Sequence, residues 1–469
     1  MKTFQEFTKA QAEGQELEFI RSAIGEYRSS EEYRIALDAE EYEAERNTTI
    51  NEYTRWLYSA NGQKVEDFTA ANNKIASNFF HRLTTQRVSY SLGNGISFAS
   101  REKQFIDGKF VSVDTTKDAL GDDFDTVLYE AAHNALVHRV CYLFWNLDHA
   151  DFFKATEFCP LFDEYDGSLK AGIRFWSLDW DQKPVTVVVY EQNGYTKYRT
   201  REKGKGLDLV LYEPKRAYKQ QIAHNEIDED EIIGESNYSY IPIVPLWGNK
   251  FHQSDLVGMK AKIDAYDLVK SGFANDLEDC AQIYWIIGNA LGMSDSDLSQ
   301  FRDRLKLQHI AVMDTDNSNI TPYKQEIPTV AQQTLLDSLR AQIYDDYGAL
   351  DVTNIGAGAN ITATEIRAAY QTMDEEADAF EYQVIKAVRG ILQIIGIEDM
   401  PIFQRSRVSN EMEQTQMIMM SANYLDDETV IRKLPFVTPD EADEIMLRKL
   451  AYDQSFVQGQ EEEEEPEEV

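Results

Sequence analysis

The chain has 469 residues and a formal net charge of −36, because its 82 acidic residues outnumber its 46 basic ones. With 43% apolar residues, a chain of this length predicts two or more compact units. The excess of carboxylates argues against tight binding to nucleic acid, since that affinity comes mainly from Lys and Arg on phosphates. The acidity either keeps a large assembly in solution or lets a polyanion pass without sticking.

The first 60 residues are predicted to be helical and highly charged. Two amphipathic segments are expected there, with apolar faces formed by Leu17, Ile20, Ala23 and Ile24, and by Tyr42, Ile50, Tyr53 and Trp56. A helix is predicted within 72–95, with Ile75, Phe79 and Leu83 on its apolar face and a Gly-Asn-Gly turn at its end. Another helix is predicted over about 119–139.

The periodicity then changes to that of strands. Residues 140–146 and 170–247 are rich in alternating β-branched and aromatic residues. The runs 185–191 and 195–201 flank Gln192, Asn193 and Gly194, which predicts a hairpin. Further runs at 207–212 and 216–222 are expected to extend the same antiparallel meander.

Two long helices follow, over about 254–279 with Ser254 as N-cap, and over about 329–346. At about 1.5 Å rise per residue the first spans roughly 40 Å. The insert between them, 280–327, predicts a helix near 295–304 and strands at 310–313 and 320–324. The pattern indicates a stalk of two helices with a small mixed tip.

The least regular part of the chain, 346–365, contains Gly348, Gly356 and Gly358 and is predicted to be flexible. Thr362 and Glu365 form a capping box that starts a helix over about 363–395, which Gly390 weakens and Gly396 ends. A strand at 402–408 and a helical unit at about 410–452 follow. The glutamate-rich tail is expected to be disordered.

No motif for catalysis or metal binding is visible. Gly358 is followed by Ala359 and Asn360, so the glycine segment lacks the Lys of a phosphate-binding loop, and no GxSxG occurs. His133 and His138 stand five residues apart on one helix, which is poor geometry for a shared metal. Close acidic pairs are expected by chance among so many carboxylates. We therefore expect no enzymatic activity, no cofactor and no metal.

The remaining composition bears on compartment and assembly. Cys141, Cys159 and Cys280 form no CxxC pair and lie in apolar stretches, which predicts buried thiols in a reducing compartment. A polar N-terminus and the lack of any apolar run near about 20 residues predict a soluble protein made inside the cell. The aromatic content of 12% favours an oligomer mildly, with core packing as the simpler explanation.

The order of these elements resembles the portal proteins of tailed phages, in the branch typical of siphophages of Gram-positive hosts, over about residues 30–455. The resemblance lies in three stretches: NNKIASNFFHRLTTQRVSYSLGNG at 72–95, YIPIVPLWGNKFHQSDLVGMKAKIDAYDLVKSGFANDLEDCA at 240–281, and NIGAGANITATEIRAAYQTMDEEA at 354–377. It implies an α+β, mainly helical portal fold with an antiparallel sheet in the wing, in a ring oligomer usually of twelve subunits.

By position, the resemblance implies a wing at 1–253 and 363–408, stem helices at 254–279 and 329–346, a clip at 280–328, a tunnel loop at 347–362, a crown at 409–455 and a disordered tail at 456–469. The candidate DNA-channel residues of the tunnel loop are Asp351, Thr353, Asn354, Ile355, Gly356, Gly358 and Asn360. The stem candidates are Lys260, Lys262 and Lys270, and the clip candidates for docking are Ser294, Asp295, Arg302, Arg304, Asp316 and Asn317.

The resemblance also implies partners and a location. The clip would meet the terminase large subunit and then a head-completion adaptor, the wing would meet scaffolding and major capsid proteins, and double-stranded DNA would pass non-specifically. The protein would lie at a capsid vertex of the virion and in the host cytoplasm during assembly, with no membrane. The alternatives are another head or minor capsid protein, and a nuclease or hydrolase that uses clustered carboxylates with Mg²⁺.

Overall fold

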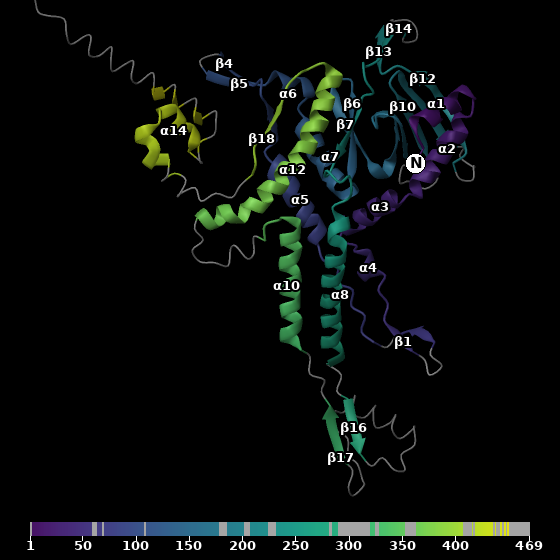
Figure 1. Ribbon diagram of the computed structural model, residues 1–469, viewed down its shortest axis with the longest axis vertical. Coiled ribbons are helices and arrows are strands. Elements are labelled where there is room, and N and C mark those ends of the chain that lie inside the picture. The colour runs from purple at the N-terminus through teal and green to yellow at the C-terminus, as the bar shows by residue number, and fades with distance from the viewer. Residues whose placement is uncertain are drawn as a thin grey trace, which may run out of the picture. The chain divides into compact units, whose positions relative to one another are not determined.

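A computed structural model gives the fold of the chain (Figure 1). It describes most of residues 2–406 and scattered positions between 415 and 449. The residues outside this description are 1, 59–62, 68–69, 107–108, 178–184, 201–206, 224–230, 281–283, 289–318, 324–327, 352–362, 407–414, 416–417, 435–436, 438–440, 443–444, 447 and 450–469.

The helices and strands have the following bounds. The α-helices are α1 Phe4–Ala12, α2 Glu16–Arg28, α3 Glu31–Glu43, α4 Thr48–Asn51, α5 Phe79–Leu92, α6 Thr115–Leu120, α7 Phe124–His138, α8 Leu256–Cys280, α10 Thr329–Tyr347, α12 Ala363–Ile395 and α14 Asp427–Lys433. The 3-10 helices are η1 Ala155–Glu157 and η2 Ala422–Tyr424. The strands are β1 Trp56–Tyr58, β2 Lys64–Glu66, β3 Ile96–Phe98, β4 Glu102–Ile106, β5 Lys109–Val113, β6 Val140–Asn146, β7 His149–Lys154, β8 Phe158–Phe162, β9 Leu169–Trp176, β10 Thr186–Glu191, β11 Gly194–Thr200, β12 Leu209–Arg216, β13 Lys219–Ala223, β14 Glu231–Ser236, β15 Ile243–Trp247, β16 Tyr284–Gly288, β17 Asn319–Tyr323 and β18 Pro401–Phe403.

The chain divides into two compact units. The first unit comprises residues 1–45, 78–260 and 344–469, and the second comprises 46–77 and 261–343. The second unit therefore contains most of α8 and α10, the β16–β17 hairpin and a segment of the chain that precedes α5. The expected combination of many helices with antiparallel sheet is confirmed.

The main sheet of the first unit has five antiparallel strands in the order β12-β11-β10-β9-β8. The predicted hairpin is present as β10–β11, with Glu191 paired to Gly194 across the two residues Gln192 and Asn193. Gly194 has φ of +126°, and a Cβ there would lie 2.1 Å from the carbonyl oxygen of Arg216. Glycine is thus required at this turn both by the backbone conformation and by the neighbouring strand.

Helices α1 and α2 cover one face of this sheet. Their apolar side chains Phe7, Ile20 and Ile24 are almost fully buried in one cluster with Ile173 and Val187 of the strands. The predicted apolar face of α2 is thereby confirmed for Ile20, Ala23 and Ile24. A Thr3–Glu6 capping box starts α1, so the first helix begins where its sequence provides partners for free backbone N–H groups.

A second sheet, in the order β15-β6-β7, lies at the centre of the other large core of the first unit. Helices α7 and α12 pack on it, with Leu136, Cys141, Leu246, Val384 and Ile391 in one buried cluster. Cys141 and Cys159 are free and buried, as predicted, and burial raises the pKa of Cys159 to about 12. The side chain of Cys280 lies outside the described part of the chain.

Several element boundaries differ from the sequence-based prediction. The helix expected within 72–95 begins only at Phe79, so Ile75 lies in the extended segment before α5. The helix expected over 119–139 is two helices, α6 and α7, separated at Gly121, whose φ is +88°. The expected amphipathic helix through Trp56 is also wrong, because Trp56 belongs to β1.

Two strand predictions also need correction. The run at 216–222 does not continue the meander, because β13 pairs with β14 in a separate two-stranded sheet. The strand expected at 402–408 is the shorter β18, which pairs with β3. For 216–222 the strand was predicted correctly but its partner was wrong, whereas of 402–408 only residues 402 and 403 lie in a strand and 404–406 do not.

Helix α12 continues through Gly390 to Ile395. A Cβ at Gly390 would lie 2.7 Å from Cγ1 of Val244 on β15, so this glycine allows the helix to approach the sheet. Gly396, at φ +81°, follows the last helical residue, as predicted. Across the helices that the structure describes, none is both long and apolar enough to cross a membrane.

Candidate channel and docking elements

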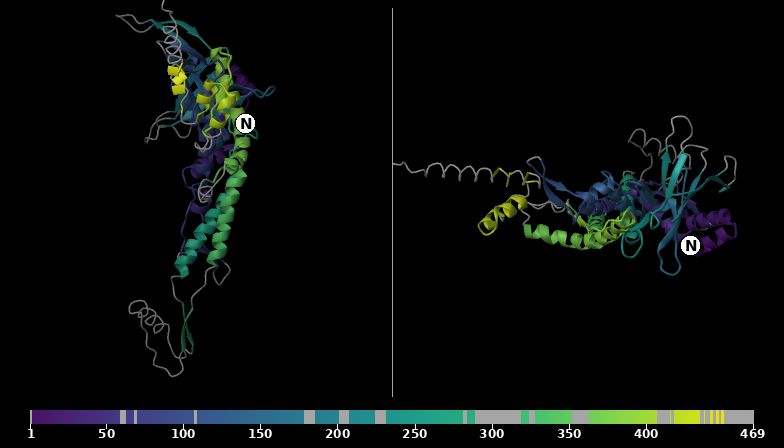
Figure 2. Two further views of the ribbon diagram at one scale, coloured as in Figure 1. Left: turned by 90° about the vertical axis from the view of Figure 1, so that its left-hand side faces the viewer. Right: turned by 90° about the horizontal axis from the view of Figure 1, so that it is seen from above.

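Helices α8 and α10 run side by side in opposite directions and are joined through the β16–β17 hairpin (Figures 1 and 2). The side-chain amide of Gln332 on α10 donates a hydrogen bond of 3.0 Å to Asp276 on α8. Three apolar side chains on these helices are exposed to solvent. Leu277 of α8 is 51% exposed, and Val330 and Leu335 of α10 are 79% and 47% exposed. The two predicted helices are therefore present, whereas the predicted helix near 295–304 and the predicted strand at 310–313 lie outside the described residues.

Ser254, the predicted N-cap, lies two residues before Leu256, where α8 begins. Its hydroxyl accepts a hydrogen bond of 3.2 Å from the backbone N–H of Leu256 and donates one of 2.5 Å to the carbonyl of Val137. The second bond fixes the beginning of α8 to the end of α7. A sequence pattern identifies the first interaction, whereas only the fold supplies the second.

The segment 46–77 lies along α8 within the second unit. Asn47 donates to buried Asp267 at 2.5 Å, Thr49 donates to Asp264 at 2.8 Å, and the N–H of Ile75 donates to Ser271 at 3.0 Å. Through these bonds, polar side chains of α8 contact the segment 46–77 instead of solvent. The sequence predicted an amphipathic helix through Ile50 and Trp56 here, but it gave no sign that this segment pairs with α8.

The three stem lysines lie in different surroundings. Lys260 donates to the hydroxyl of Tyr42 at 2.6 Å, and its Nζ lies 3.5 Å from Asp38. Lys270 places its ammonium 5.8 Å from the ring centroid of Tyr266, and Lys262 is half-buried. The ammonium of Lys260 is therefore held by α3, which limits its reach toward any ligand.

The end of α10 is fixed where the predicted tunnel loop begins. The side-chain amide of Gln86 on α5 both donates to the carbonyl of Leu350, at 3.0 Å, and accepts from its N–H, at 3.1 Å. Of the seven candidate loop residues, Asp351 is described and half-buried. Thr353, Asn354, Ile355, Gly356, Gly358 and Asn360 lie outside the described residues.

Arg87 of α5 joins residues at the beginning of α8, at the end of α10 and within α12, all of which belong to the first unit. Its guanidinium donates to Asp255 at 3.1 Å, before α8, and to the carbonyl of Tyr347 at 2.6 Å, at the end of α10. It also lies 3.4 Å from Glu376 on α12 and 4.0 Å from the ring of Tyr347. The nearby negative groups raise the pKa of Arg87 against the effect of its burial. No sequence pattern pointed to Arg87.

All six clip candidates lie outside the described residues, namely Ser294, Asp295, Arg302, Arg304, Asp316 and Asn317. Within 280–328 the backbone of β16 and β17 is described, and the two strands pair from Tyr284–Tyr323 to Gly288–Asn319.

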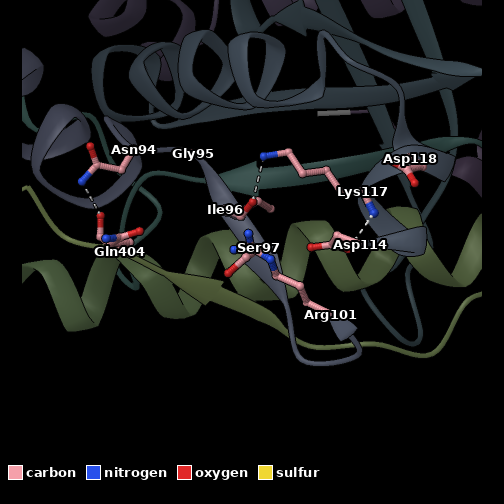
Figure 3. A pocket seen from close by; sticks show the side chains of 9 residues that line it. All are labelled: Asn94, Gly95, Ile96, Ser97, Arg101, Asp114, Lys117, Asp118 and Gln404. Carbon is pink, nitrogen blue, oxygen red and sulfur yellow. Dashed lines mark hydrogen bonds between the residues drawn. The ribbon is translucent and has the colours of Figure 1, made fainter. Parts of the chain in front are cut away.

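A polar cavity of about 250 Å³ opens beside β3 and α6 in the first unit (Figure 3). Lys117 points toward it but donates to Asp125 at 2.6 Å and to the carbonyl of Ile96 at 3.2 Å. Asp114 accepts from the N–H of Lys117 and from that of Phe98. The charges of Lys117 and Asp114 are thus already compensated by the protein, so this cavity supports no assignment as an anion site.

One group of metal-ligating side chains exists among the residues described. Glu43 of α3, His81 of α5 and His133 of α7 place their ligand atoms within 4.8 Å of one another. Burial opposes ionisation of Glu43, but the two imidazoles lower the pKa of this carboxyl below its ordinary value. From the sequence, His133 could be compared only with His138 on the same helix as a possible metal ligand. The group with Glu43 and His81 was therefore not predicted.

Known proteins share this order of elements. A family model described as phage portal protein, SPP1 Gp6-like, matches residues 29–455. The chain belongs to this portal protein family. The portal protein of Clostridium phage phiCD119 is 26% identical over 81% of this chain and 85% of its own length, and that of Bacillus phage SPP1 is 22% identical over 84% and 79%.

The resemblance to phage portal proteins that the sequence indicated is thereby confirmed. Among solved structures, this portal chain is similar to one described as the neck of a native GTA particle computed with C12 symmetry, at 11% identity and a TM-score of 0.42, over 76% of this chain and 89% of that one. As a member of the portal protein family, the protein is a structural component of a phage particle.

Proposed function

We propose that copies of this chain form a ring, of twelve subunits, around a channel through which double-stranded DNA enters and leaves the phage head. The observation that carries the proposal is the family match over 29–455 together with the paired helices α8 and α10. The exposed apolar side chains Leu277, Val330 and Leu335 on these helices are suited to packing against a neighbouring copy.

Within the ring, we assign the wing to residues 1–253 and 363–408, the stem to 254–279 and 329–346, and the crown to 409–455, with 456–469 as a disordered tail. The clip, 280–328, would dock the terminase large subunit during packaging and an adaptor afterwards. The wing would contact scaffolding and major capsid proteins. The ring would assemble in the host cytoplasm and remain at one vertex of the virion.

Electron microscopy and mass measurement of the purified full chain test the ring. We expect closed rings with a central hole and a mass of twelve subunits. Val330→Asp and Leu335→Asp should shift the population toward monomers, because each places a carboxylate at the proposed stem interface. Leu147→Asp is the matched control, since Leu147 is 55% exposed in the β6–β7 turn. Monomers or closed shells from the unaltered chain would contradict the proposal.

The tunnel loop, 347–362, would line the narrowest part of the channel, with Thr353, Asn354 and Asn360 offering weak polar contacts to the DNA backbone. Replacing 352–361 by a short Gly-Ser linker and measuring the length of packaged DNA tests this role. We expect shorter or fewer packaged genomes, and unchanged packaging would exclude a contribution of the loop.

We further propose that the chain is not an enzyme and that ATP hydrolysis belongs to the terminase. The purified ring should show no ATP turnover above that of a buffer control, with or without DNA and Mg²⁺. Turnover that co-purifies with the ring, or cleavage of DNA that requires Mg²⁺, would favour the enzymatic alternative instead.

A further inference from the structure

Three helices of the first unit bring together a carboxylate and two imidazoles that the proposed channel does not use. Glu43 is the last residue of α3, His81 lies in the first turn of α5, and His133 lies in the middle of α7. The side chains of Glu43 and His133 are each 20% exposed and that of His81 is 47% exposed. The group is therefore partly buried and open to solvent on the side of His81.

Both imidazoles approach the same carboxylate oxygen. Nδ1 of His81 lies 2.5 Å and Nε2 of His133 lies 3.2 Å from Oε1 of Glu43. Zinc binds such nitrogen and oxygen atoms at about 2.0–2.2 Å, so three ligands around one ion lie roughly 3 Å apart. The separations of the two nitrogens from Oε1 of Glu43 are close to that spacing, and all three ligand atoms lie within 4.8 Å of one another. Side-chain rotations that bring the two nitrogens together around one point would admit the ion.

The burial of His133 distinguishes this group from ordinary surface ion pairs. Nε2 of His133 is buried and has no hydrogen-bond partner among the described residues, although it lies 3.2 Å from Oε1 of Glu43. The hydroxyl of Thr84 on α5 lies 3.3 Å from the other oxygen of Glu43, but its single proton has a closer acceptor in the carbonyl of Phe80, at 2.9 Å.

We propose that Glu43, His81 and His133 bind one zinc ion, with water completing its coordination. Two imidazoles and one carboxylate are a ligand set that zinc accepts with a fourth position open. Ca²⁺ and Mg²⁺ prefer sites made entirely of oxygen ligands, so the two nitrogens disfavour them. The exposed ring of His81 provides the path by which the ion enters.

A bound ion would hold the end of α3 to α5 and α7. The chain passes into the second unit at Arg46, three residues after Glu43. The ion would therefore fix the last helical residue before this crossing. Because an ion that binds only the folded protein stabilises it by mass action, zinc should raise the temperature of unfolding.

The test uses the full chain without a histidine tag, treated with a chelator and titrated with Zn²⁺ by calorimetry and with Co²⁺ by visible absorption. We expect one tight ion per chain and a Co²⁺ spectrum typical of nitrogen and oxygen ligands. His81→Gln and His133→Gln should each lose at least tenfold in affinity. His149→Gln is the matched control, because His149 also contacts carboxylates, Asp148 and Asp151, but is 53% exposed.

The same variants are compared by thermal unfolding with and without Zn²⁺. The unaltered chain and His149→Gln should unfold at a higher temperature with zinc, whereas His81→Gln should not respond. If His133→Gln fails to fold, His81→Gln and Glu43→Gln decide the matter, since the ring of His81 is largely exposed. No tight ion in the unaltered chain, or the same affinity in His81→Gln, would overturn the proposal.

Discussion

Arg87 illustrates how a single buried charge can organise several elements. Its side chain is 12% exposed and that of Asp255 is 6% exposed, so their ion pair is largely removed from water. Removing one partner of a buried pair leaves the other charge uncompensated, which typically costs about 3–5 kcal/mol. The beginning of α8 and the end of α10 would lose their common partner at the same time.

We expect Arg87→Met to lower the free energy of unfolding by about 3–5 kcal/mol, measured by urea denaturation. Arg21→Met is the control, because Arg21 and Asp208 form an ion pair of 3.0 Å at which both side chains are about 40% exposed. That control should cost about 0–1 kcal/mol. Equal losses in the two variants would show that Arg87 does not hold this junction.

The ionisation of Asp267, in the second unit, should make the stability of the folded protein depend on pH. The side chain is fully buried, and this burial raises its pKa above the ordinary value of 3.8, against the hydrogen bond from Asn47. The folded state therefore holds the proton more tightly than the unfolded state. Stability from this group is present at low pH and is lost as the pH rises from 3.8 through the raised folded pKa.

Asp267→Asn cannot ionise, so we expect its stability relative to the unaltered chain to increase between about pH 4 and about pH 7. Urea midpoints at the two pH values measure this change. Asp118→Asn, which alters an exposed carboxylate of the first unit, is the control. If the stability of Asp267→Asn differs from that of the unaltered chain by the same amount at both pH values, the pKa of Asp267 is not raised.

At the scale of elements, replacing two glycines inside helices by alanine should have opposite effects on stability. Gly390 of α12 lies against β15, where a Cβ would come within 2.7 Å of Val244. Gly25 of α2 has open space around its Cα, so an added methyl group would meet nothing within 4 Å. Glycine in the middle of a helix normally costs about 0.5–1 kcal/mol relative to alanine.

Gly25→Ala should therefore raise the free energy of unfolding by about 0.5–1 kcal/mol. Gly390→Ala should instead lower it by about 1–3 kcal/mol, because the added methyl group overpacks the contact with Val244. Thermal or urea unfolding of the two variants makes the comparison. Stabilisation by Gly390→Ala would mean that α12 can move away from the sheet at little cost.

At the scale of the whole molecule, charge limits what the protein does with DNA. A ring of twelve chains, each with a net charge of −36, should repel duplex DNA at long range. Weak attraction suits a channel through which DNA has to move, because each phosphate held by Lys or Arg would have to be released again.

We therefore expect no retention of linear duplex DNA by the purified ring at about 0.15 M salt, measured by gel retardation or fluorescence anisotropy. A basic DNA-binding protein in the same assay is the positive control. Tight binding that falls steeply with added salt would reveal a basic surface that the net charge conceals.

Several features could be predicted from the sequence because they depend on local chemistry. The helices α8 and α10 follow from apolar residues at steps of three and four, with Ser254 as N-cap. The β10–β11 hairpin follows from two alternating runs around Gln192, Asn193 and Gly194. The family resemblance rests on the order of such elements, and it was confirmed over 29–455.

The sequence by itself thus determined the type and order of the main elements, since helix and strand periodicity are properties of neighbouring residues. Only the tertiary structure decided that β13 pairs with β14, that Arg87 joins four elements, and that Glu43 and His81 meet His133. These side chains are tens to hundreds of residues apart, and no local pattern encodes which of them meet. Which of these side chains come into contact depends on how the apolar faces of the helices and sheets pack, and that packing is a property of the whole core.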